Sequence, residues 1–181
     1  YIYEITYKDK KWHKQLLLYQ KNNTIADFCS LNNTLYLITD APLKPITKHN
    51  SKPPFQNQES NSKTKEHYFS AFQPETKKVK VIQKIDKGFY HITTSTENNT
   101  IILASHHTIL RYNLTTRTFK EPIYSEGIRD IAALNNLLYI NCRASLTNRY
   151  NKDPKLVIYD MKKKTILTEI DGYFGKFSYV Y

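Results

Sequence analysis

Three side chains that could do chemistry recur at one point of a repeating strand pattern. Asp27, His91 and Asp130 each stand early in a short apolar segment, and these segments align with one another along the 181-residue chain. Carboxylate and imidazole groups are ordinary metal ligands. If the segments surround one axis, the three side chains converge at its mouth, on the same face as His106 and His107. The pattern therefore allows a metal or small-ligand site at that point.

The same residue types also have a structural role, in which a short polar side chain caps the backbone of a neighbouring segment. No tight ligand spacing joins Asp27, His91 and Asp130, and this favours capping over metal binding. The sequence contains no Ser-His-Asp or Cys-His arrangement, no phosphate-binding loop and no paired-cysteine zinc signature. We therefore expect no cofactor and no enzymatic activity, with a bound metal ion as the alternative.

Positively charged residues gather at a second recurring position, the turn between the last two strands of each unit. Several such turns on the face opposite His106 would form a basic rim that binds polyanions with a steep salt dependence. The alternative is a set of solvated turns whose lysines protect strand edges. The absence of interleaved aromatic residues disfavours nucleic acid as the partner. The rim residues are Lys8, Lys10, Lys11, Lys77, Lys78, Arg117, Lys162, Lys163 and Lys164.

The elements that must position these residues are clearest between residues 127 and 170. Gly127 opens a strand-like segment at residues 128–134, Asn135 and Asn136 turn the chain, and residues 137–142 return. A polar loop at residues 144–154 then leads to two further strand-like segments joined by a basic turn. Four short strands connected by polar turns predict one blade of a β-propeller.

Copies of this unit recur along the chain about every 40 residues, which lies within the range of propeller repeats. The strongest internal match is Leu-Asn-Asn-x-Leu-Tyr, at residues 31–36 and 134–139. The pattern predicts an all-β fold, namely a β-propeller of about four blades or a partial arc of a larger one, with four-stranded antiparallel blades. The copies fall at residues 1–20, 21–85, 86–126 and 127–171, with a partial copy at 172–181.

Two features interrupt or close this arrangement. Residues 41–67 are polar and proline-containing, and we expect a long mobile loop there because too little apolar surface is present to order it. Residues 1–18 and 172–181 could supply the outer strands and the inner strand of one shared blade, which would close the ring. Trp12 is expected to pack between blades.

The segments that join the last two strands of each copy carry a resemblance to known repeats. They read Val-Ile-Tyr-Asp-Met-Lys-Lys-Lys at residues 157–164, Leu-Arg-Tyr-Asn-Leu-Thr-Thr-Arg at 110–117 and Ser-Ala-Phe-Gln-Pro-Glu-Thr-Lys at 70–77. Each resembles the second half of quinoprotein-type and YVTN-type propeller repeats, without the glycine usual in those turns. No Trp-Asp pair, kelch di-glycine or sialidase aspartate box is present. The resemblance thus implies the propeller architecture and no catalytic subfamily.

The composition limits the setting and the partners. A formal net charge of +11 favours an acidic partner. Cys29 and Cys142 fall in different copies, and we expect two buried thiols. No apolar run reaches the roughly 18 residues of a membrane span. The first residue is Tyr1, which predicts a processed product or a fragment and gives a mild preference for a periplasmic or secreted protein.

Together these features predict a non-catalytic β-propeller scaffold that mediates protein–protein interaction within a larger chain or assembly. Its partner would be another protein with an acidic surface. One alternative is an enzyme, or a protein that binds a metal ion or a small ligand at the channel mouth around Asp27, His91 and Asp130. Another alternative is polyanion binding by the basic rim, with nucleic acid not favoured. The oligomeric state is left open.

Overall fold

The structure, a computed structural model, describes residues 2–18, 24–43, 66–86, 88–125, 127–143 and 154–177. These residues form β-strands and turns, and none of them belongs to a helix that could span a membrane. Most of the predicted loop at 41–67, namely residues 44–65, lies outside the described residues. So does the predicted loop at 144–154, apart from Pro154.

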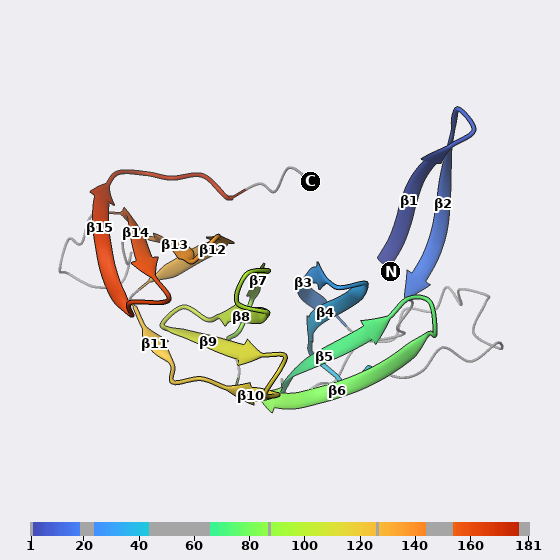
Figure 1. The fold of residues 1–181 in the computed structure, drawn as a ribbon, viewed down its shortest axis with the longest axis horizontal. Coiled ribbons are helices and arrows are strands. Elements are labelled where there is room, and N and C mark those ends of the chain that lie inside the picture. Colours follow the sequence, from blue (N-terminus) through green and yellow to red (C-terminus); the bar gives the residue numbers. More distant parts are fainter. Residues whose placement is uncertain are drawn as a thin grey trace, which may run out of the picture.

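Three antiparallel sheets follow one another along the chain, and each runs from its first strand to its last in sequence order. Figure 1 shows them side by side around an open arc, with β3, β7 and β12 innermost. The first sheet contains β3 (Ile25–Leu31), β4 (Thr34–Thr39), β5 (His67–Gln73) and β6 (Lys78–Ile85). The second contains β7 (His91–Ser95), β8 (Thr100–Ala104), β9 (Thr108–Asn113), β10 (Thr118–Phe119) and β11 (Ile123–Tyr124). The third contains β12 (Ile128–Leu134), β13 (Leu137–Cys142), β14 (Lys155–Asp160) and β15 (Thr165–Asp171).

The outer strand of the second sheet is divided in two. Both β10 and β11 pair with β9, and Pro122 stands between them. Proline has no backbone N–H to donate, so it is tolerated at a sheet edge and interrupts the ladder there. Pro122 therefore interrupts the edge strand, where a missing backbone N–H breaks the fewest hydrogen bonds of the sheet.

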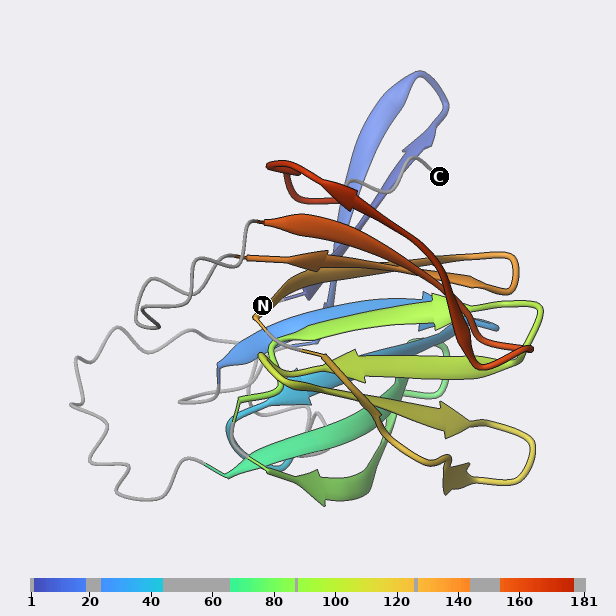
Figure 2. The ribbon, with the colours of Figure 1, turned by 90° about the vertical axis from the view of Figure 1, so that its left-hand side faces the viewer.

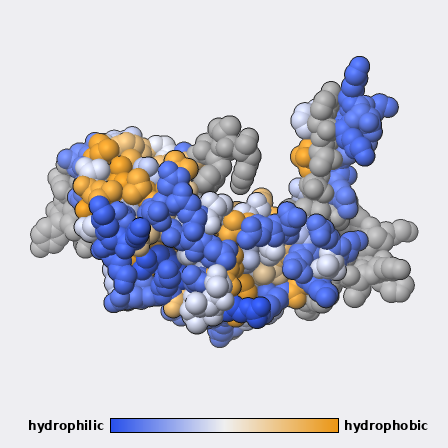
Figure 3. Space-filling view, in the orientation of Figure 1, coloured by the Kyte–Doolittle hydropathy of each residue, from blue (hydrophilic) through white to orange (hydrophobic). Residues whose placement is uncertain are grey.

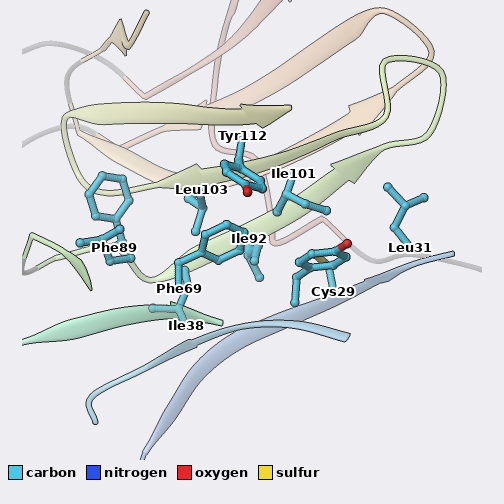
Figure 4. Packing of buried hydrophobic residues seen from close by; sticks show 11 residues of the cluster. Cys29, Leu31, Ile38, Phe69, Phe89, Ile92, Ile101, Leu103 and Tyr112 are labelled. Atoms are coloured by element: carbon cyan, nitrogen blue, oxygen red, sulfur yellow. The ribbon is translucent and has the colours of Figure 1, made fainter. Parts of the chain in front are cut away.

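Stacking of the sheets forms the core. Strand β8 is buried along its whole length, because its alternate residues face opposite neighbours. Ile101 and Leu103 pack towards the first sheet, while Ile102 and Ala104 pack towards the third. Figure 4 shows the first of these interfaces, where Phe69 of β5 lies among side chains of the second sheet. Each sheet thus buries on its neighbours the apolar surface that it cannot cover alone.

The turns explain the repeated sequence motifs. Asn32 and Asn33 both have positive φ (51° and 55°), which is the two-residue hairpin turn that asparagine favours. The turns that precede the outer strands differ, because only their last residue has positive φ. That residue is Lys77, Arg117 or Lys164, at 55° to 58°. These basic residues adopt the left-handed conformation at the position where glycine is usual.

The N-terminal hairpin departs from the expected pattern. Strands β1 (Ile2–Lys8) and β2 (Lys11–Leu18) form a two-stranded sheet. Their turn has positive φ at both Asp9 and Lys10, so it resembles the Asn32–Asn33 turn and not the other basic turns. Within the described residues β1 pairs only with β2, and residues 172–177 join neither strand. The shared closing blade is therefore not formed there.

Two individual residue predictions have opposite outcomes. The prediction that Trp12 packs between blades is wrong, since 73% of this residue is exposed. Cys29 and Cys142 are free and buried, as expected. Burial raises the pKa of both thiols, so neither is a ready nucleophile.

Candidate functional site

The structure brings Asp27, His91 and Asp130 together at the starts of the three innermost strands. They line a cavity of ≈ 340 Å³. A register irregularity precedes Asp27 in β3 and Asp130 in β12, whereas β7 pairs regularly at His91. A β-bulge turns a side chain out of its normal direction. The two bulges therefore accompany the two aspartates that reach towards the next sheet.

Both aspartates bind backbone N–H groups with their carboxylates. Asp27 accepts hydrogen bonds from Phe28 N (2.9 Å) and from Ile92 N of the second sheet (2.9 Å). Asp130 accepts from Ile131 N (2.9 Å) and, through its other oxygen, from Phe177 N (2.8 Å). Each carboxylate thus ties the inner strand of its own sheet to the inner segment that follows. This is the backbone capping that the sequence allowed as the alternative to metal binding.

His91 lies between the two carboxylates at the junction of the second and third sheets. Its Nδ1 is 3.6 Å from Asp130 Oδ1. Burial lowers the pKa of His91, although the nearby Asp130 and Asp27 act in the opposite direction. Burial also raises the pKa of Asp27, against the hydrogen bonds from Ile92 and Phe28. The strongest effect on both groups is therefore loss of water, which disfavours their charged forms.

A second row of side chains binds the carbonyl groups at the start of each following inner segment. His106 Nδ1 lies 3.3 Å from Ile128 O, and His67 Nδ1 lies 3.1 Å from Phe89 O. Asn141 Nδ2 donates to the carbonyl oxygens of Phe174 (3.1 Å) and Gly175 (2.8 Å). His106 is thus engaged at a sheet junction, although both His106 and its neighbour His107 are exposed.

Sequence reasoning missed His67, Asn141 and Lys176 in this region. Lys176 lines the cavity and precedes Phe177, as His91 precedes Ile92. The repeated glycine gave only an approximate signal for Lys176, because Gly127 lies three residues before Asp130 and Gly172 lies four residues before Lys176. His67 lies on the third strand of its sheet (β5), and Asn141 lies on the second strand of its sheet (β13). They do not occupy the same position in the repeat, so alignment of the copies could not identify them.

The arrangement suits structural hydrogen bonding better than metal coordination. Within the described parts of the chain, no three His, Cys, Asp or Glu side chains are grouped closely enough to hold a metal ion. The carboxylate oxygens of Asp27 and Asp130 already accept backbone N–H groups. A metal at this cavity stays a prediction, which metal analysis of the purified protein would test.

The basic residues lie at the other ends of the strands. Lys77, Lys78, Arg117 and Lys162 to Lys164 are exposed, and they occupy the β5–β6, β9–β10 and β14–β15 turns. Figure 2 shows the tight turns of the sheets projecting on one side of the molecule. Lys8, Lys10 and Lys11 are exposed too, but they belong to the projecting β1–β2 hairpin. The structure thus places six of the nine rim residues on or beside corresponding turns of the three sheets, and the other three on the separate hairpin.

Acidification is expected to destabilise the protein through His91. The folded-state pKa of His91 is lowered from its ordinary 6.5, so its contribution to stability is full above pH 6.5. That contribution is lost as the pH falls from 6.5 through the lowered pKa, because the unfolded chain binds the proton first. Urea unfolding of the natural chain and of His91→Gln, at about pH 7.5 and about pH 5, measures how much stability each protein loses on acidification. The variant should lose less stability between the two conditions, and an equal loss in both proteins would contradict the assignment.

Comparison with known proteins places the fold among solved structures. No family model matches the chain, and no curated protein matches it in sequence. The β-propeller domain of the trilobed protease from Pyrococcus furiosus matches with a TM-score of 0.56 and 11% identity, over 86% of this chain and 45% of that one. A chain of a nidogen/laminin complex matches with a TM-score of 0.50 and 8% identity, over 77% and 43%. The chain therefore spans less than half the length of these structures, and the likeness concerns the fold alone.

Proposed function

Because the chain folds as a divergent β-propeller, we propose that it is a non-catalytic scaffold that binds another protein. The binding surface is the set of basic turns, and the partner has an acidic surface. The observation that carries this proposal is that six exposed basic residues occupy corresponding turns of three stacked sheets. We define these as the basic turns: Lys77, Lys78, Arg117, Lys162, Lys163 and Lys164.

The basic turns are held in fixed conformations. Asp160 Oδ1 accepts hydrogen bonds from Lys162 N and Lys163 N, both at 2.8 Å. Asn113 Oδ1 does the same for Thr115 N and Thr116 N, both at 2.9 Å. A surface that is already ordered loses less conformational entropy on binding, so its charges are well suited to recognition.

The charges of these turns are open to a partner. Within the part of the chain that the structure describes, the Lys–carboxylate ion pairs join Lys84 to Glu66 and Lys155 to Glu169, away from the turns. A group of like charges steers an oppositely charged protein towards it. No aromatic residue lies within the three turns, so the stacking platform that single-stranded nucleic acid uses is missing there.

The alternative function centres on the cavity and has one observation in its favour. Asp27, His91, Asp130 and Lys176 line the same ≈ 340 Å³ space, and polar groups that converge in a pocket are typical of ligand sites. The backbone hydrogen bonds of both aspartates favour the structural role, so the scaffold is the function that we propose.

Charge reversal at the basic turns tests the proposal. Lys162→Glu with Lys163→Glu should weaken binding to immobilised poly-L-glutamate by about tenfold or more, since several charges act together. The matched control is Lys14→Glu with Lys80→Glu, which reverses two charges outside these turns and should change binding by about twofold or less. Retention is measured at several salt concentrations after circular dichroism has shown that both variants fold.

Equal losses in the two variants would overturn the proposal, because net charge alone would then explain the binding. Tighter binding of the natural chain to single-stranded DNA than to poly-L-glutamate at the same salt concentration would also overturn it. Nucleic acid would then be the better candidate partner.

A further inference from the structure

The third sheet has an apolar face that the rest of the described chain leaves partly exposed. Its other face, with Ile131, Ile140 and Val157, is buried against the second sheet. The strand register places Tyr139 beside Ile158, and Leu156 beside Ile170, on the outward face. Ile170 is 44% exposed and the other three are half-buried. Figure 3 shows hydrophobic surface gathered over this end of the arc.

The segment that follows the third sheet already occupies the place of another inner strand. Asp130 holds Phe177 N as Asp27 holds Ile92 N. Asn141 holds the carbonyl groups of Phe174 and Gly175 as His106 holds that of Ile128. Both kinds of junction contact found between the earlier sheets therefore recur beyond the third sheet. The outward face of the third sheet thus has the same contacts that join the earlier sheets to one another.

The opposite end of the arc carries the complementary piece. Leu18 of β2 is fully buried and packs with Leu37 and Phe72 on the outward side of the first sheet. The end of the β1–β2 hairpin therefore contacts the side of the first sheet on which a preceding sheet would stack, and its two strands project from there (Figure 2). Ile5 and Trp12 lie on one face of this hairpin and are 63% and 73% exposed. An isolated two-stranded hairpin is at best marginally stable in water.

We propose that two copies of this chain assemble head to tail, with the β1–β2 hairpin of one copy covering the outward face of the third sheet of the other. Residues 172–177 of one copy and the hairpin of its partner together complete a further sheet. The surfaces at the two ends of one copy differ, so the hairpin of each copy meets the third sheet of the other, and this contact occurs twice about a two-fold axis. Figure 1 shows the two ends apart within one chain, which leaves both available.

This assembly has consequences for particular exposed side chains. Ile170 and Ile5 lie on the two different surfaces that meet, and a carboxylate buried in such an apolar contact is strongly disfavoured. Ile170→Glu and Ile5→Glu should each lower the dimer association constant by about tenfold or more. Tyr124→Glu is the control, because Tyr124 is 76% exposed on β11, whose Ile123 packs with the inward face of the third sheet and not with its outward face.

Sedimentation velocity of the full chain tests the proposal. We expect dimers of the natural chain and of Tyr124→Glu, and monomers of Ile170→Glu and Ile5→Glu. Mixing the two monomeric variants should restore a dimer through one of its two contacts, because Ile170→Glu keeps its hairpin surface and Ile5→Glu keeps the outward face of its third sheet. Circular dichroism and thermal unfolding of each variant confirm that it folds.

Three outcomes would overturn the proposal. The first is a natural chain that stays monomeric up to its solubility limit. The second is a dimer unchanged by both glutamate variants. The third is a mixture that fails to recover the dimer, because the hairpin of one copy and the third sheet of the other would then not form the contact. Binding to poly-L-glutamate does not depend on these surfaces, so failure here leaves the proposed function standing.

Discussion

Replacement of Phe69 by alanine is expected to lower the free energy of unfolding by about 3–5 kcal/mol. Phe69 is fully buried between the first and second sheets. Its ring centroid lies 5.4 Å from that of Tyr112 and 6.1 Å from those of Tyr36 and Phe119. Removal of the ring loses its burial and leaves a cavity that the flat sheet surfaces cannot close by small movements.

The matched control for Phe69→Ala is Phe28→Ala. Phe28 is 50% exposed on β3, so its removal should cost about 1 kcal/mol or less. Urea unfolding, followed by both fluorescence and circular dichroism, measures both variants. If Phe69→Ala costs no more than Phe28→Ala, the described junction of the first two sheets is wrong. Since whole domains are stable by only about 5–15 kcal/mol, the expected loss is a large fraction of the total.

Removal of the Asp27 carboxylate is the second large effect. Asp27→Ala should lower the free energy of unfolding by about 2 kcal/mol, because it leaves Ile92 N–H without its acceptor and removes a charged hydrogen bond. Ile92 is buried, so water does not readily replace the lost partner. Urea unfolding near neutral pH measures this loss.

Asp27→Asn separates the hydrogen bond from the charge. Burial raises the pKa of Asp27, so the stability that its protonated form contributes is present below the ordinary pKa and lost as the pH rises through the raised pKa. Asparagine carries no charge to desolvate and keeps one oxygen acceptor for Ile92 N, although its NH2 group cannot accept the hydrogen bond from Phe28 N. We therefore expect a loss of about 1 kcal/mol or less near neutral pH. A larger loss for asparagine than for alanine would contradict the capping role.

The sequence was informative about local structure because the repeats encode it locally. The Asn-Asn turns require positive φ, which few residue types tolerate, so Asn32–Asn33 was a reliable sign of a hairpin. The continuous apolar run of β8 was likewise consistent with a strand covered on both faces. The β-propeller fold, in the form of an arc of four-stranded antiparallel sheets, could thus be predicted.

Features that depend on contacts between distant segments were harder to predict. The closing blade and the packing of Trp12 rested on the position of the β1–β2 hairpin, which no local pattern specifies. The same limit applies to the basic turn of that hairpin, whose Lys-Asp-Lys-Lys sequence looked like the others. Its two positive-φ residues distinguish it only once the backbone is known.

The candidate site was predicted in part for the same reason. Equivalent positions in a repeat converge, so alignment alone selected Asp27, His91 and Asp130, which share one cavity. Alignment could not tell whether their oxygens face a ligand or a backbone N–H. That distinction depends on the β-bulges and on the start of the next inner segment, both of which are properties of the assembled fold.

In this structure, polar side chains of one sheet hold the inner segment that follows it. Amide hydrogen exchange at Ile92, followed by NMR, tests it most directly. The Ile92 amide donates to the Asp27 carboxylate, so we predict slow exchange in the natural chain and faster exchange in Asp27→Ala. Exchange of the Ile92 amide in the natural chain at the rate of a solvent-exposed amide would contradict the account.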